Sequence, residues 1–129
     1  MAENTIRDLI QAINAKDVDT ISSLLSDEHV YIDAAMDSSF NREDTVAAWQ
    51  VLFELFPDYS IEVEQLFNDG ANTWVIFGSA EGTYKSIVED DARWVTPASW
   101  KVVVTKDKVT LWQVYADTKL QEDIIAKYS

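Results

Sequence analysis

The stretch NREDTVAAWQVLFELFPDYSIEVEQLF, residues 41–67, contains the change of periodicity that decides the fold. Up to residue 56 its apolar side chains recur every three or four residues, as on one face of a helix, and acidic residues occupy the first turn. Pro57 cannot continue that helix. Beyond it, Ile61 and Val63 alternate with glutamates, which is the period of a half-buried strand. The stretch therefore predicts a helix over residues 41–56 and then a strand.

Downstream of this stretch the pattern predicts a run of long strands. Turn residues at positions 68–70 join the first strand to a second run over residues 73–84. Gly78 and Gly82 interrupt the second run, and glycines inside a strand usually mark bulges or bends, so we expect the sheet to curve strongly. After a polar loop, a second hairpin and a short final helix are predicted over residues 94–105, 109–117 and 120–128.

Upstream of it, apolar residues at helical spacing predict a helix over residues 4–15 and a shorter helix that Asp17 caps. A strand from about His29 to Ala35 follows. Helices that precede a meander of strands are typical of an α+β domain whose helices pack on one face of an antiparallel sheet. We therefore expect a single domain over residues 1–129, in which helices cover a curved antiparallel sheet and form a cone with an apolar pocket.

Composition supports one folded domain and narrows the classes of partner. The chain has 129 residues, near the commonest domain size, and 47% of them are apolar. Its formal charge of −13 repels phosphate backbones and anionic lipid, so neither nucleic acid nor a membrane is an expected partner. Such a charge more often provides solubility than attraction of a cationic substrate. The lack of cysteine, of a signal-like start and of a long apolar run predicts a cytoplasmic protein.

Four strings carry a resemblance to a known superfamily: AINAKD (residues 12–17), LLSDEHVYID (24–33), FPDYSIEVE (56–64) and YAD (115–117). Together with the order of elements they resemble the nuclear transport factor 2-like superfamily, and within it the SnoaL-like polyketide cyclase and ketosteroid isomerase-like branches. None of the strings is a strict catalytic signature, so the resemblance concerns the fold more than the activity. It implies a cone-shaped barrel with a deep pocket at its open end, frequently as a homodimer packed through the outer face of the sheet.

Asp33 stands where the ketosteroid isomerase-like branch keeps the carboxylate that moves a proton next to a carbonyl. It also ends an apolar strand, and an acid in an apolar pocket loses hydration, which favours its taking up a proton. The alternative is an exposed aspartate that bonds a turn. That branch stabilises its enolate oxygen with a tyrosine and a protonated acid. Leu9 and Ala98 stand at those two places here, so steroid isomerisation by the same donors is not expected.

Asp117 matches the acid/base carboxylate of the cyclase-like branch, near the end of the last strand. Alternation along that strand puts one set of side chains on one face, namely Val109, Leu111, Gln113, Tyr115 and Asp117. If this face lines the cone, Gln113, Tyr115 and Asp117 form a polar column in an apolar wall. Alternatively, Asp117 caps the C-terminal helix. Trp112 and Val114 lie on the opposite face, where they suggest contact with a second copy of the chain.

His29, Tyr31 and Asp33 occupy alternate positions, so one strand face carries all three, and His29 could share a proton transfer with the carboxylate. A surface position for His29 is the alternative. No second histidine and no cysteine completes a metal shell, so no metal is expected. Five tryptophans are more than a core of this size needs, and Trp49 and Trp100 are candidates to line the pocket, although the spacing of Trp49 also fits a core position.

These features predict a small-molecule enzyme of the polyketide cyclase or ketosteroid isomerase-like type that needs no cofactor. In it, Asp33 or Asp117 removes a proton next to a carbonyl. Tyr31, Tyr115 or Gln113 then donates a hydrogen bond to the oxygen. The alternative is a non-catalytic domain that binds a small apolar ligand or a protein partner, and lyase or hydrolase chemistry stays open. The expected ligand is a small apolar or carbonyl-containing molecule.

Overall fold

The order of helices and strands agrees closely with the sequence-based expectation in the computed structural model, which describes residues 2–34 and 37–129. The helices are α1 (Ala2–Ala15), α2 (Val18–Leu24), α3 (Arg42–Leu55) and α4 (Lys119–Tyr128). The strands are β1 (Leu25–Asp33), β2 (Ser38–Phe40), β3 (Ser60–Asn68), β4 (Thr73–Thr83), β5 (Arg93–Thr105) and β6 (Lys108–Ala116). β1 ends at Asp33, and its expected end at Ala35 lies outside the described residues.

Side-chain caps fix where the helices begin. The Asp17 carboxylate accepts a hydrogen bond from the Thr20 amide at 3.2 Å, and the Asn41 side chain accepts one from the Asp44 amide at 2.9 Å. Pro57 follows the last turn of α3, as expected. None of the helices in the described part of the chain combines the length and apolar composition of a membrane span.

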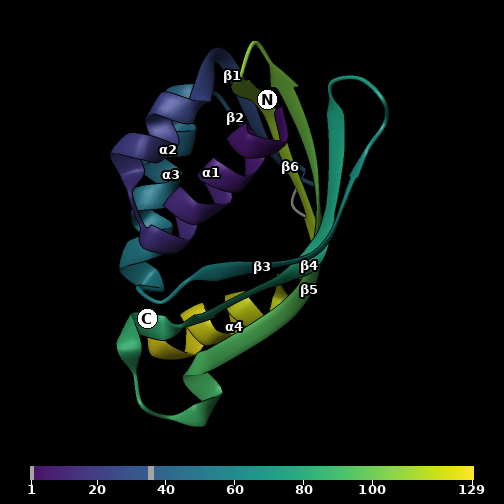
Figure 1. Ribbon diagram of the computed structural model, residues 1–129. Coiled ribbons are helices and arrows are strands. Elements are labelled where there is room, and N and C mark those ends of the chain that lie inside the picture. Colours follow the sequence, from purple (N-terminus) through teal and green to yellow (C-terminus); the bar gives the residue numbers. More distant parts are fainter. Residues whose placement is uncertain (1, 35–36) are drawn as a thin grey trace.

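All six strands form one curved, unclosed sheet in the order β2-β1-β6-β5-β4-β3. Helices α1 to α3 lie inside its curve, and α4 lies along β5 at the other end of the sheet (Figure 1). Neighbouring strands are antiparallel as expected, with one exception: β1 pairs with β6 in parallel. The hairpins fix the direction of β6 in the sheet. β1, which lies near the N-terminus, pairs with β6 along its free edge. The direction of a pairing between strands so far apart in the sequence cannot be predicted from local patterns.

Curvature has a local cause in the β3–β4 hairpin. The register shifts by one residue between Val63 and Gln65, so β3 bulges there opposite Gly78. A β-carbon at Gly78 would lie 1.9 Å from the carbonyl oxygen of Glu62, closer than any real contact. The bulge therefore requires glycine at this position, and it bends the strand. The expectation that a glycine in this run marks a bulge is confirmed for Gly78, whereas Gly82 pairs with Trp94 in regular register.

A second irregularity decides which face of β6 points inward. Val103 pairs with Leu111 but Val104 pairs with Val109, so Thr110 is an extra residue that reverses the alternation. Beyond it, Trp112 is buried with an exposed fraction of only 2%, whereas Tyr115 is 49% exposed. The prediction that Trp112 lies on the outer face is therefore wrong.

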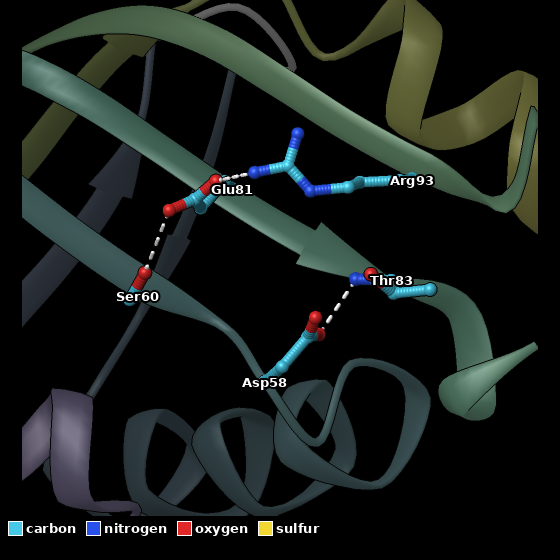
Figure 2. Close-up of polar contacts among 5 residues, drawn as sticks. All are labelled: Asp58, Ser60, Glu81, Thr83 and Arg93. Carbon is cyan, nitrogen blue, oxygen red and sulfur yellow. Dashed lines mark hydrogen bonds and ion pairs between the residues drawn. The ribbon is translucent and has the colours of Figure 1, made fainter. Parts of the chain in front are cut away.

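Polar contacts hold the strand ends together at the edge of the sheet that carries β3 (Figure 2). Glu81 forms an ion pair with Arg93 on the next strand and accepts a hydrogen bond from the Ser60 hydroxyl at 3.4 Å. The Asp58 carboxylate accepts a hydrogen bond from the Thr83 amide at 2.6 Å, as Figure 2 shows. These groups are partly or fully exposed, so they add little stability and mainly favour the register of the strands.

Candidate functional site

Two adjoining cavities lie against the inner face of the sheet, the first beside α3 and the second between Leu52 of α3 and Gln121 of α4. The first has a volume of about 200 Å³ and the second of about 90 Å³. Tyr31, Asp33 and Leu52 belong to the walls of both. The first cavity is completed by Ser38, Phe40, Thr45, Ala48 and Trp49. The second is completed by Tyr59, Ala80, Trp94, Thr96, Ala98, Trp100, Val114, Ala116, Thr118 and Gln121.

Asp33 is the last residue of β1 and is half-buried. The register places it beside Ser38 of β2 on one side and Val114 of β6 on the other, where both cavities meet. It is the one carboxylate among the described residues that line the two cavities. A carboxylate in mostly apolar surroundings can accept a proton from a bound molecule, provided that the molecule lies within hydrogen-bonding reach.

Two phenol side chains flank Trp49 next to this carboxylate. The rings of Tyr31 and Tyr59 each meet the indole edge to face, with centroid distances of 6.3 and 5.9 Å. Burial raises the pKa of Tyr31, and the nearby Asp33 carboxylate raises it further. Burial also raises the pKa of Tyr59, with a smaller contribution from Tyr31. Both hydroxyls therefore stay protonated at neutral pH and can donate hydrogen bonds to a ligand.

Tyr59 is a site residue that the sequence-based analysis missed. It follows Pro57 in the turn after α3, where its amide donates a hydrogen bond to the Phe56 carbonyl at 2.9 Å. A turn residue has no helical or strand period, so alternation gives no sign that its ring points inward. The available signal was the string over residues 56–64, which carried the resemblance but was used only for the fold.

The sequence pattern of the SnoaL-like domain matches residues 6–122 of this chain. The chain belongs to the SnoaL-like domain family. This match confirms the expected place of the chain in the SnoaL-like branch of the nuclear transport factor 2-like superfamily. The expected α+β fold is also confirmed.

Solved structures similar to this SnoaL-like domain come from several bacteria. IdmH, a candidate polyketide cyclase of Streptomyces antibioticus, is 16% identical with a TM-score of 0.80, over 98% of this chain and 99% of that one. A candidate SnoaL-like polyketide cyclase of Shewanella denitrificans is 16% identical, with a TM-score of 0.79 over 98% and 97%. An LEH-like epoxide hydrolase of M. tuberculosis is 16% identical, with a TM-score of 0.78 over 98% and 90%. At such identities the likeness shows the fold alone, and no curated protein matches the chain.

The polar column expected on the last strand of this SnoaL-like domain is not in the cavities. The bulge at Thr110 turns Leu111, Gln113 and Tyr115 to the outer face, so their expected place on the pocket wall is wrong. Asp117 is exposed, and its carboxylate accepts a hydrogen bond from the Lys119 amide at 3.0 Å at the start of α4. This contact agrees with the capping alternative.

The two tryptophans expected at the pocket do reach it: Trp49 lines the first cavity and Trp100 the second. Trp49 also stacks on Phe53 at a centroid distance of 5.6 Å, so it serves the core as well. Leu9 is buried, and Ala98 lies on the second cavity wall. Neither side chain can donate a hydrogen bond, as the sequence indicated. In the described part of the chain, no three His, Asp or Glu side chains come together as metal ligands.

His29 lies on the same strand face as Tyr31 and Asp33 but does not line either cavity. Its exposed fraction is 1%, so the surface alternative is wrong. Nδ1 lies 2.8 Å from the Val109 carbonyl oxygen and donates to it, while Nε2 is buried without a partner among the described residues. Burial lowers the pKa of His29; the bond to Val109 raises it in part, and the charge of Arg42 lowers it further. The lowered pKa favours the neutral imidazole in the folded state.

The neutral His29 predicts a specific acid sensitivity of folding. An unfolded histidine has a pKa of about 6.5, and the folded one lies below it. As the pH falls below about 6.5, the unfolded state binds the proton more readily than the folded state, so stability is lost. We expect the free energy of unfolding of the wild type to fall relative to His29→Gln between about pH 7.5 and 5. Urea denaturation across this range checks it, and parallel profiles of the two proteins would contradict it.

Proposed function

We propose that this SnoaL-like domain is an enzyme that removes a proton next to the carbonyl group of a small apolar substrate, with Asp33 as the base. The observation that carries the proposal is the position of Asp33, on the wall shared by two mostly apolar cavities, near the Tyr31 phenol and on the same cavity wall as Tyr59. Asp117 is the weaker candidate because it is exposed and bonded to the start of α4.

In the proposed reaction the Asp33 carboxylate takes a proton from the carbon next to the carbonyl. The electron pair of that C–H bond forms a C=C bond, and the π pair of the carbonyl moves onto its oxygen. Tyr31 and Tyr59 donate hydrogen bonds to this enolate oxygen, which supplies the stabilisation that Leu9 and Ala98 cannot. Where the substrate is a β,γ-unsaturated ketone, the enolate is conjugated and recovers the proton at its γ-carbon, which is isomerisation. Where the molecule has a second carbonyl, the enolate carbon attacks it, which is ring closure. Asp33 returns its proton to the product in both cases.

Cavity size limits the substrate. An apolar cavity of about 150 Å³ is enough to hold benzene. The first cavity, at about 200 Å³, therefore suits a single ring, and the second, at about 90 Å³, suits a short side chain. Together they reach only the lower end of the roughly 300–1,000 Å³ typical of ligand pockets. A fused multi-ring substrate does not fit these cavities as they stand.

Proton exchange tests the proposal without knowledge of the natural product. A panel of single-ring ketones is incubated with the protein in D₂O, and loss of the NMR signal of the protons next to the carbonyl is followed. We expect at least one ketone to exchange faster than in buffer. Leu52→Trp replaces a leucine on the wall common to both cavities with a bulkier indole, which would fill the space for the ketone. We expect this variant to stay folded and to lose the exchange. Exchange of no ketone above the buffer rate would count against catalysis and favour the non-catalytic alternative.

The homodimer that the resemblance implies is part of the same proposal. The outer face of the sheet carries exposed apolar residues, among them Phe67, Phe77 and Tyr115, and the first two meet edge to face at 6.0 Å. Such exposed clusters commonly mark protein contacts.

A cytoplasmic location stays a prediction from the cysteine-free sequence.

We expect the wild type to elute as a dimer and Phe77→Glu, which buries a charge in this face, to elute as a monomer. Val51→Glu is the matched control, since Val51 is also exposed but lies on α3, and it is expected to leave the dimer intact. Size-exclusion chromatography with light scattering measures both. A monomeric wild type, or a dimer that survives Phe77→Glu, would contradict this part of the proposal.

A further inference from the structure

The first cavity has the composition of a site for an organic cation. Three aromatic side chains, Tyr31, Phe40 and Trp49, belong to its wall, and Asp33 is the charged residue among them. The Tyr31 ring lies 6.0 Å from that of Phe40 and 6.3 Å from that of Trp49, with planes inclined by 44° and 85°. These are tilted and edge-to-face contacts, and each of the three rings also forms part of the cavity wall. No lysine or arginine is among the described residues of the wall.

We propose that this cavity binds an alkylated ammonium group, enclosed by Tyr31, Phe40 and Trp49 and neutralised by Asp33. Aromatic faces attract cations, and cages of such rings recognise quaternary ammonium groups. An alkylated ammonium has few or no N–H groups to satisfy, which matches a wall that offers few acceptors. Beyond the carboxylate, that wall has the hydroxyls of Ser38, Thr45 and Tyr31, and the Thr45 hydroxyl donates to the Phe40 carbonyl at 3.5 Å.

Charge and volume agree with this occupant. A formal charge of −13 raises the local concentration of cations around the whole molecule, and Asp33 places one negative charge at the cavity itself. The volume of about 200 Å³ exceeds the ~150 Å³ that holds benzene, so a trimethylammonium group fits. The inference goes beyond the proposed function and does not rest on it: it names a second class of ligand for the first cavity, where the ammonium group would take the place proposed for the substrate ring.

Three small probes separate cation binding from shape and from general charge. Choline carries the trimethylammonium group; the alcohol in which a tert-butyl group replaces it has the same shape without charge; ethanolamine has the charge without the methyl groups. Isothermal titration of the wild type at fixed ionic strength is expected to give choline an affinity about tenfold above that of either control. Equal affinities for choline and the tert-butyl alcohol would overturn the proposal.

Two variants tie that affinity to the cavity. Phe40 is 36% exposed, so Phe40→Leu is expected to fold and to weaken choline about three- to tenfold while leaving the tert-butyl alcohol unchanged. Asp33→Asn is expected to weaken choline alone. If both variants bound choline with the affinity of the wild type, the cation would bind elsewhere and the inference would be overturned. Choline is not a ketone, so this result is independent of proton exchange: binding without exchange would refute the proposed function and leave the cation site standing.

Discussion

Asp33→Asn is expected to slow the exchange of ketone protons with D₂O by about 100- to 10,000-fold, the usual contribution of a positioned general base. Asparagine has nearly the shape of aspartate but cannot take a proton from carbon. The wall of both cavities, including the phenols of Tyr31 and Tyr59, would stay in place. The rate therefore reports the loss of the base and not the loss of the binding site. NMR measurement with the ketone that the wild type exchanges fastest gives the comparison.

Asp117→Asn is the matched control, because it makes the same chemical change at an exposed carboxylate outside both cavities. We expect its exchange rate to stay within about twofold of the wild type, since asparagine can also accept the hydrogen bond from the Lys119 amide and only an exposed charge is lost. Unfolding curves of both variants verify that the cavities persist. An Asp33→Asn protein that exchanges as fast as the wild type, or a loss caused by Asp117→Asn instead, would refute the assignment of the base.

Gly78→Ala is expected to destabilise the fold by about 3 kcal/mol or more, at the upper end of the cost of overpacking. The added methyl group would lie 1.9 Å from the Glu62 carbonyl oxygen and 3.3 Å from the Val63 α-carbon. Both are backbone atoms of the bulge, so no side chain can turn aside to make room. Either the bulge shifts and the β3–β4 register breaks, or the sheet loses its bend. Urea denaturation measures the change in the free energy of unfolding.

Ser79→Ala serves as the control, because it introduces the same side chain at the neighbouring residue of β4, which pairs with Glu62 in regular register and already has a β-carbon. It is expected to cost less than about 1 kcal/mol. If both variants were equally stable, the account of the curvature would be wrong, since glycine would then not be required at the bulge.

Much of the fold could be predicted from the sequence because its signals are local. Asp17 and Asn41 begin their helices with a side-chain hydrogen bond, and Pro57 ends α3. Each of these boundaries can therefore be predicted from the residue next to it. Gly78 predicted the bend of β4 because the bulge in β3 lies directly opposite it. Asp33, which lines both cavities, could be predicted as a candidate because it combines a charge with the end of an apolar strand.

The rest depends on contacts between distant segments. β1 pairs with β6 across some eighty residues, and neither strand indicates that the pairing is parallel. The extra residue Thr110 reverses the alternation in β6, which moved Gln113 and Tyr115 from the expected wall to the outer face. A bulge at a threonine has no glycine to mark it. The inward position of Tyr59 follows from the turn after α3 and from the packing of its ring against Trp49.

The hollow space beside Asp33 underlies every functional statement above, and a crystal of the protein pressurised with xenon tests it most directly. Xenon binds in dry apolar cavities of this size. The account predicts a xenon atom in the first cavity, between Trp49, Tyr31 and Leu52. Electron density in which side chains fill that space and exclude xenon would contradict it.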